Sequence, residues 1–280
     1  MTAMGTYKIV RAEMERLPSN TELSHTFATQ WSGTLCVDGK FVKVRGHAKK
    51  IPFIYGIDYS THDIPCGLLA LSESFASFDG LFSMLQGLGY PLRVCIGDDS
   101  AALQAALQSR FPRAAFQLCQ THYLENVRGL LRVRTDGRYL PFFASFSRLF
   151  VRGLSREKRM ETLKKLRGMY DDRLLSAVIA DLYNHYDELF AYEAFAEHVP
   201  HSNNLIEAFN SHLNARLASM KGFESLQSAA LWLNAWMLRR RTKPFTDCEE
   251  PFRGLNGRCS IETTMRSGAT LKDIFRFLNM

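Results

Sequence analysis

The fold is decided by a central stretch, residues 77–119, which reads SFDGLFSMLQGLGYPLRVCIGDDSAALQAALQSRFPRAAFQLC. Its first part has the apolar spacing of a helix face, and Gly89 and Pro91 end that helix. LRVCIG (92–97) is typical of a buried strand, AALQAALQSRF (101–111) of a helix and AAFQLC (114–119) of another strand. Helix, strand, helix, strand in this order indicates parallel βαβ units.

The flanking sequence adds strands before this stretch and helices after it. GTLCVDGKFVKVR (33–45) predicts either a hairpin at Asp38-Gly39 or one long strand with a bulge. IPFIYGID (51–58) and CGLLALSES (66–74) predict two further strands, and we expect these neighbouring strands to be antiparallel. Residues 7–30, nearly all of 121–200, and residues 201–220, 225–241 and 269–278 have helical patterns. We therefore predict an α/β fold with a mixed sheet, three antiparallel strands followed by parallel ones, and a large all-helical insertion.

Composition and charge narrow the class of protein. Of the 280 residues 46% are hydrophobic, which is enough for a packed core. The net charge of +7 is uneven, because residues 110–173 hold 15 basic and 6 acidic side chains, whereas residues 174–207 hold 6 acidic ones and no Lys or Arg. A basic segment of this kind fits either a polyanion partner such as nucleic acid or a solvated charged surface.

The sequence predicts neither secretion nor a membrane span. No apolar run reaches eighteen residues, and the first twenty residues mix both charges without the apolar core of a signal peptide. Three of the 6 Cys lie in strand-like apolar runs, which favours reduced core thiols over a disulfide framework. We expect a protein of the cytoplasm, associated with the nucleoid, if the source is bacterial, and of the nucleus if it is eukaryotic.

Three carboxylates stand at positions that suit a metal site. Asp38 lies within the most strand-like run, Asp98 ends an apolar strand, and Glu207 follows Asn203-Asn204 at the start of a helix, on one side with them. Each has an ordinary alternative: turn formation with Gly39 for Asp38, helix capping for Asp98, and a solvated helix face for Glu207. Together they are the minimum for two Mg²⁺ ions that promote phosphoryl transfer.

A C-x-x-H pair, Cys119 and His122, follows the last predicted strand. One such pair provides two of the four ligands that zinc needs, so a buried thiol and a hydrogen-bonded His that support the core are the favoured interpretation. Trp232 and Trp236 are one helical step apart and are expected in the core rather than stacked on a base.

Four segments together resemble the Mutator-like group of transposases and their bacterial insertion-sequence relatives. They are CVDGKFVKV (36–44), IGDDSAAL (96–103), RFPRAAFQLCQTHYLENV (110–127) and SNNLIEAFNSHLNAR (202–216). In that family a C-x-x-H motif follows the second Asp, then an all-helical insertion and a helix with an Asn-Asn-x-x-Glu signature. The resemblance runs from about residue 33 to 245.

The resemblance implies a ribonuclease H-like core in two parts, residues 31–125 and 201–245, an insertion at 126–200, a short N-terminal helical segment at 1–30 and a C-terminal tail at 246–280. It implies cleavage and strand transfer of double-stranded DNA, at transposon ends and target, with two Mg²⁺ or Mn²⁺ ions held by Asp38, Asp98 and Glu207. Cys119, His122, Asn203 and Asn204 would support the site. The basic insertion would grip DNA through Arg128, Arg132, Arg134, Arg138, Lys164 and Lys165, and synapsis would require a homodimer or larger assembly.

Two alternatives share these residues. A ribonuclease H-like nuclease or resolvase would use the same triad, and a domesticated, transposase-derived DNA-binding protein would need none of it. A metabolic α/β enzyme lacks support, because the sequence has no G-x-G-x-x-G, Walker or G-x-S-x-G motif.

Overall fold

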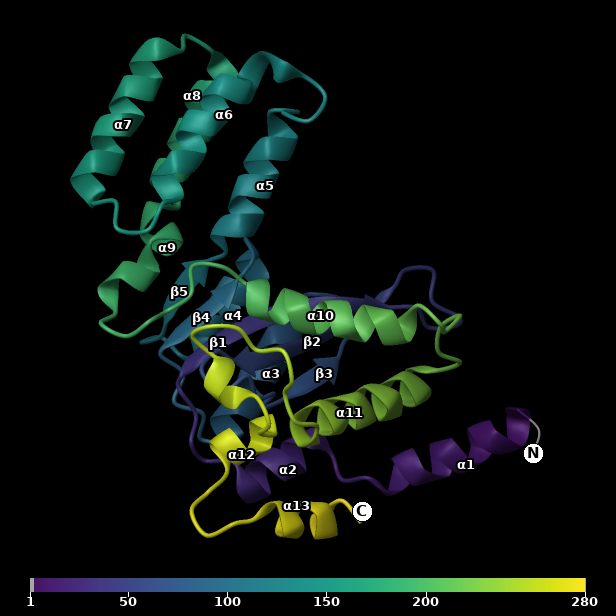
Figure 1. Ribbon diagram of the computed structural model, residues 1–280. Helices are drawn as coiled ribbons and strands as arrows, with labels where there is room; N and C mark the ends of the chain where they lie inside the picture. Colours follow the sequence, from purple (N-terminus) through teal and green to yellow (C-terminus); the bar gives the residue numbers. More distant parts are fainter. Residues whose placement is uncertain (1–2, 280) are drawn as a thin grey trace. The chain divides into compact units, whose positions relative to one another are not determined.

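The computed structural model describes residues 3–279, which form a mixed α/β protein (Figure 1). Five strands form one sheet in the order β3-β2-β1-β4-β5. Their bounds are β1 Thr34–Val42, β2 Ile51–Asp58, β3 Gly67–Leu69, β4 Val94–Gly97 and β5 Ala115–Leu118. The chain divides into two compact units, one of residues 1–95, 100–115 and 203–280, and one of residues 96–99 and 116–202. We call them the sheet unit and the helical unit.

The first three strands confirm the predicted antiparallel arrangement. β1 pairs with β2 in a register that sets Asp38 opposite Tyr55, and β2 pairs with β3. β1 runs through Asp38-Gly39 without turning, so the predicted hairpin is wrong and a long strand forms. Its pairing with β2 is continuous, so the bulge predicted with that long strand is absent from this pairing. β3 is much shorter than the predicted 66–74, because the chain bends at residues 71–73. Ser74 then caps the following helix, its side chain accepting from the amide of Ser77.

The helices of the sheet unit follow the apolar patterns closely. α3 buries Phe78, Leu81, Phe82 and Leu85, as its spacing predicts. Ser100 caps α4 through the amide of Leu103, so Asp98 is not needed as the cap. The bounds are α1 Ala3–Arg16, α2 Asn20–Phe27, α3 Phe75–Gly87, α4 Ala101–Arg110, α10 Asn204–Leu217, α11 Leu226–Thr242, α12 Ser260–Thr264 and α13 Leu271–Phe277, with the 3-10 turn η4 Arg253–Leu255.

A buried ion pair ties α11 to the rest of the sheet unit. Arg241 and Asp63 are fully buried, and two parallel hydrogen bonds of 2.8 Å join the guanidinium to the carboxylate. Arg241 also donates to the Asn20 and Ser24 side chains in α2. Asp63 accepts from the hydroxyls of Ser260 and Thr264 in α12, at 2.7 and 2.6 Å. The network therefore connects three helices with the loop between β2 and β3.

The helical unit has its own aromatic core. Phe142, Phe146 and Phe150 are buried and contact one another in sequence, with ring centroids 5.5 and 5.9 Å apart. Arg159 is buried beside them and pairs with Glu193 at 2.5 Å. The helices are α5 Gln120–Leu130, α6 Leu140–Ser147, α7 Arg156–Met169, α8 Arg173–Asn184 and α9 Tyr186–Leu189, with the 3-10 turns η1 Gly137–Tyr139, η2 Arg148–Phe150 and η3 Ala191–Ala194.

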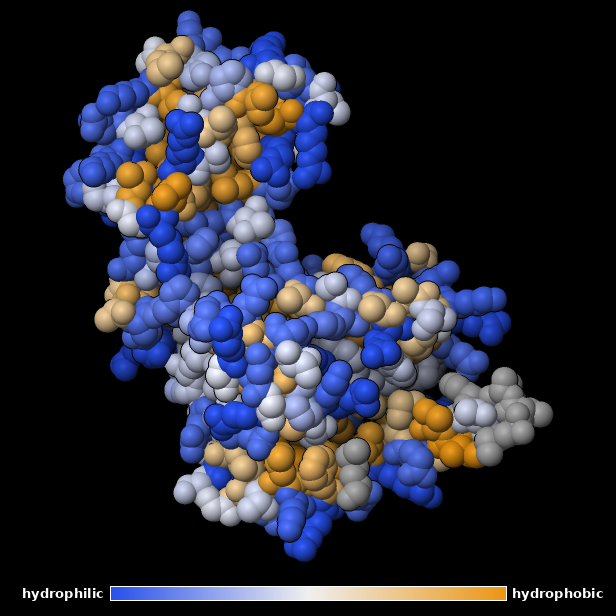
Figure 2. All heavy atoms as spheres, viewed as in Figure 1, coloured by the Kyte–Doolittle hydropathy of each residue, from blue (hydrophilic) through white to orange (hydrophobic). Residues whose placement is uncertain are grey.

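The surface of the helical unit mixes hydrophilic and apolar side chains (Figure 2). Its exposed apolar residues include Leu130, Leu140, Val151 and Met169. Within residues 3–279, no helix has the length and apolar character needed to span a membrane. All six cysteines are free thiols and five of them are buried, as expected for core thiols. Burial raises the pKa of the Cys66 thiol to about 12, so this thiol is protonated at neutral pH.

Candidate active site

The sheet unit positions Asp38 and Glu207. Asp38 is half-buried in β1, where its Oδ1 accepts a 2.7 Å hydrogen bond from the Gly39 amide. The Asn210 side chain in α10 donates to Asp38 Oδ2 at 2.6 Å, and Tyr55 Oη in β2 donates to Asn210 Oδ1 at 2.9 Å. A chain of hydrogen bonds from β2 through α10 thus fixes the orientation of the Asp38 carboxylate.

Glu207 lies on the face of α10 that contacts β1. Asn203, at the cap position before α10, donates from its buried side chain to the Val37 carbonyl in β1 at 2.9 Å. Asn203, Glu207 and Asn210 are spaced i, i+4 and i+7, which places them on one side of the helix. Asn203, one turn before Glu207, contacts β1 at Val37, and Asn210, one turn after it, contacts β1 at Asp38. The half-buried Glu207 carboxyl is therefore directed to the same part of the sheet.

The second amide on this face is Asn210, which the sequence analysis missed. We expected Asn203, Asn204 and Glu207 on one side, but the Asn204 side chain is exposed whereas Asn203 and Asn210 are buried. The i+7 spacing from Asn203 was the available signal. It could not be used without knowing which side of α10 faces the sheet.

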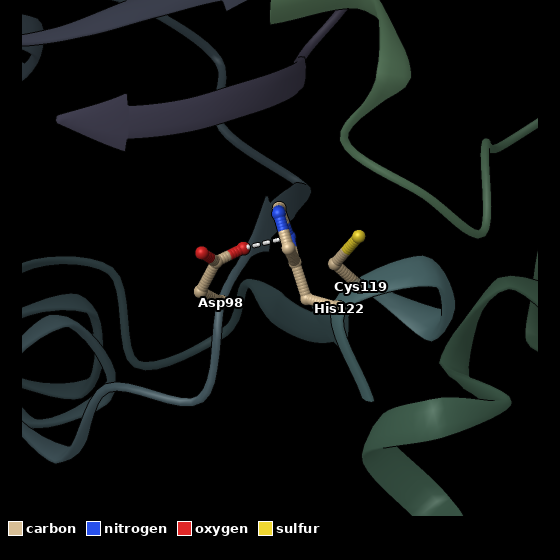
Figure 3. Close-up of side chains that lie close together, drawn as sticks. All are labelled: Asp98, Cys119 and His122. Carbon is tan, nitrogen blue, oxygen red and sulfur yellow. Dashed lines mark ion pairs between the residues drawn. The ribbon is translucent and has the colours of Figure 1, made fainter. Parts of the chain in front are cut away.

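The helical unit holds Asp98, Cys119 and His122 close together (Figure 3). Asp98 follows β4, Cys119 precedes α5, and His122 lies in the first turn of α5. His122 Nδ1 pairs with Asp98 Oδ1 at 2.5 Å, and one ligand atom of each of the three residues lies within 4.8 Å of the other two. In Figure 3 the second carboxylate oxygen of Asp98 points away from the imidazole. The predicted C-x-x-H pair therefore meets the carboxylate that ends β4.

The pKa of His122 is raised to about 11, first by its hydrogen bond to the Asp98 carboxylate and then by one to Cys119. His122 is therefore cationic at neutral pH and holds Asp98 in one orientation. Cys, His and carboxylate groups are also typical ligands of zinc, and these three would leave a fourth position to be filled. Asp99, the neighbour of Asp98, is exposed.

The six basic side chains predicted to grip DNA lie on the helical unit, and four of them pair with carboxylates. Arg128 and Arg134 both pair with Glu125, Arg138 pairs with Asp172, and Lys165 pairs with Glu161. Arg132 and Lys164 are exposed. Exposed ion pairs are weak, so a DNA phosphate can displace these carboxylates. Each displacement breaks an existing ion pair, which reduces the net gain from binding.

The mixed α/β fold carries carboxylates on β1, after β4 and on α10, and carboxylate oxygens are the ligands that hard metal ions prefer. Comparison with protein families identifies the family to which the chain belongs. Residues 19–241 match the model described as Transposase, Mutator family, and the chain belongs to that family. The matched range contains all three carboxylates and the C-x-x-H pair. Membership makes the chain a transposase whose partner is DNA. No curated protein matches it.

Proposed function

We propose that the chain is the catalytic part of a DDE-type transposase, in which Asp38, Asp98 and Glu207 act together in metal-dependent cleavage and strand transfer of DNA. Family membership supports the reaction class. The observation that carries the assignment of residues is the hydrogen bond from Asn210 to Asp38, because it orients one carboxylate from the same helix face that presents Glu207. The ribonuclease H-like character of the fold is part of this proposal, supported by three antiparallel strands that precede β4 and β5.

The donor set of the sheet unit fits Mg²⁺ or Mn²⁺. Asp38 and Glu207 offer carboxylate oxygens, the ligands these hard cations prefer, and both are only half-buried, so water and phosphate can reach them. Asp98 would add the oxygen that points away from His122. Two bound ions would neutralise phosphate charge and lower the pKa of the attacking hydroxyl. Asn210 and His122 hold Asp38 and Asp98 in fixed orientations, and this positioning is the protein's own contribution to phosphoryl transfer.

The test is Mn²⁺-dependent nicking of a labelled DNA duplex by the purified chain and by Asp38→Asn, Asp98→Asn and Glu207→Gln. Each substitution removes one charged ligand at nearly constant volume, and we expect a rate loss on the order of a thousandfold with DNA binding in EDTA retained. Asp99→Asn is the matched control, because it removes the exposed neighbouring carboxylate. If Asp99→Asn abolished nicking and Asp98→Asn did not, the second carboxylate would be misassigned.

Strand transfer separates the transposase from the two alternatives. A labelled, pre-cleaved DNA end with a free 3′-hydroxyl should become joined to a target plasmid, and two copies of the chain are expected to bridge two ends. Nicking without joining would support a ribonuclease H-like nuclease or resolvase. DNA binding with neither reaction would contradict the catalytic proposal and support a domesticated DNA-binding protein.

A further inference from the structure

The sheet unit contains a basic cavity that the catalytic proposal does not use. Its volume is about 470 Å³, within the range of ligand sites, and it is lined by α1, α10, α11 and the segment that follows α11. Four cationic side chains line it, with a single carboxylate, Asp247, and the indole of Trp232. The four are Arg216, Arg239, Arg240 and Lys243. Trp236 is buried as expected, but the expectation of a core position was wrong for Trp232, which is half-buried at the cavity. The lining is therefore cationic and partly aromatic.

Arg240 is held in place by aromatic rings and forms no ion pair within 4.0 Å among the described residues, although the Asp247 carboxylate in the same cavity offsets part of its charge. Its guanidinium lies 4.5 Å from the ring centroid of Phe209 and 5.5 Å from that of Phe245. Its Nε is buried and has no hydrogen-bond partner within residues 3–279. Burial lowers the pKa of Arg240, and the Asp247 carboxylate opposes that shift only in part. A buried donor without a hydrogen-bond partner on a half-buried cation is costly, and an anion bound in the cavity would offset that cost.

The neighbouring Arg241 shows what a structural arginine looks like in this fold. Arg241 is fully buried and bidentate to Asp63, and its Nη1 donates to the side chains of Asn20 and Ser24. By contrast, none of the four cations that line the cavity forms an ion pair among the described residues. Four unpaired cations around one cavity are more than a single small phosphate requires, and a series of phosphates would use them all.

We propose that this cavity, with Arg216, Arg239, Arg240 and Lys243, binds the phosphates of a single DNA strand and stacks one of its bases on Trp232. A basic groove with an aromatic platform is the usual arrangement of single-strand sites. This inference rests on the proposed function for the presence of unpaired strands near transposon ends. The surface is separate from the proposed catalytic face, because Arg216 follows Glu207 by nine residues, about two and a half turns, and so lies on the opposite side of α10.

The test measures binding of a fluorescein-labelled single-stranded oligonucleotide in EDTA by anisotropy at several salt concentrations. The variant is the double substitution Arg239→Gln/Lys243→Gln, at two exposed positions that can change without disturbing the core. Its control is Lys272→Gln/Arg276→Gln on α13, which also removes two exposed charges but does not touch the cavity. The first double should lower the salt slope of log K by about 1.4 and the affinity roughly tenfold, and the control should change both far less.

Stacking has an independent readout. Binding should quench tryptophan emission, and Trp232→Phe should remove most of that quenching. An equal loss of affinity in the two double variants, quenching that persists in Trp232→Phe, or inorganic phosphate competing as effectively as the oligonucleotide per phosphate would each overturn the inference. Glu207→Gln should bind normally, so a failure of catalysis leaves this result intact, and a failure here leaves the nicking result intact.

Discussion

Breaking the buried pair between Arg241 and Asp63 tests how the sheet unit is held together. Arg241→Met keeps most of the side-chain volume but removes the guanidinium, so Asp63 retains only the hydroxyl donors of Ser260 and Thr264. Both charges are fully buried, and water cannot replace the lost partner without opening the core. The substitution leaves a buried, unpaired carboxylate, and such losses cost about 3–5 kcal/mol.

A double-mutant cycle separates this penalty from ordinary packing losses. Asp63→Leu leaves the Arg241 charge buried without its partner and should also cost about 3–5 kcal/mol. The double variant Asp63→Leu/Arg241→Met buries neither charge, so it should be more stable than the sum of the two losses predicts, by about 2 kcal/mol or more. The coupling arises because each single variant leaves the other charge buried without a partner.

Urea unfolding followed by tryptophan fluorescence measures the loss of stability of the sheet unit. All three tryptophans, Trp31, Trp232 and Trp236, lie in the sheet unit, so their emission reports the unfolding of that unit. The control is Arg110→Met, which breaks a bidentate pair with Asp79 that is partly exposed, and its midpoint should shift much less. A loss below about 1 kcal/mol for Arg241→Met, or strictly additive losses in the double variant, would refute the reasoning.

Two further predictions concern backbone strain and pH. Gly33 and Gly46 have φ of +82° and +83°, so alanine at either should cost about 1–2 kcal/mol, but only at Gly33 would the new Cβ lie 2.4 Å from the Pro91 carbonyl oxygen. Gly33→Ala should therefore unfold at a clearly lower urea concentration than Gly46→Ala, and equal midpoints would contradict the predicted clash. Burial, and to a lesser extent the Arg240 charge, lowers the pKa of His62 from 6.5 to about 4, so the folded state binds fewer protons than the unfolded state between these values. Stability should be complete above about pH 6.5 and fall by about 3 kcal/mol as the pH drops to 4, and His62→Phe should flatten that slope; an unchanged slope would exclude His62 as its source.

Much of the fold could be predicted because its signals are local. The apolar spacing of α3 and the short apolar run of β4 depend only on neighbours in the chain, and the structure places both as expected. β1 remained ambiguous, because Asp38-Gly39 is a turn-prone pair and only its pairing with β2 keeps the strand straight. Local preference was overridden there by eight paired positions on one neighbouring strand.

The residues of the candidate site were chosen from the sequence and remain a prediction, whereas their contacts come from the structure alone. Asp38, Asp98, Glu207 and the C-x-x-H pair were singled out from their places along the chain. The amide that orients Asp38 comes from Asn210, 172 residues away. Asn210 takes this role because its side of α10 faces β1, and the local sequence pattern does not predict which side of the helix faces the sheet.

The adjacent residues Arg240 and Arg241 show which features the sequence predicts and which depend on the tertiary structure. By sequence alone they are two adjacent cations in the last turn of a predicted helix. One turns into the core to meet Asp63, 178 residues away, and the other lies between Phe209 and Phe245 beside a basic cavity. The sequence determined the elements, the family and the acidic residues, because those depend on composition and spacing. Only the tertiary structure decided which charge is neutralised and which remains available, because partners for a charge are set by distances in space.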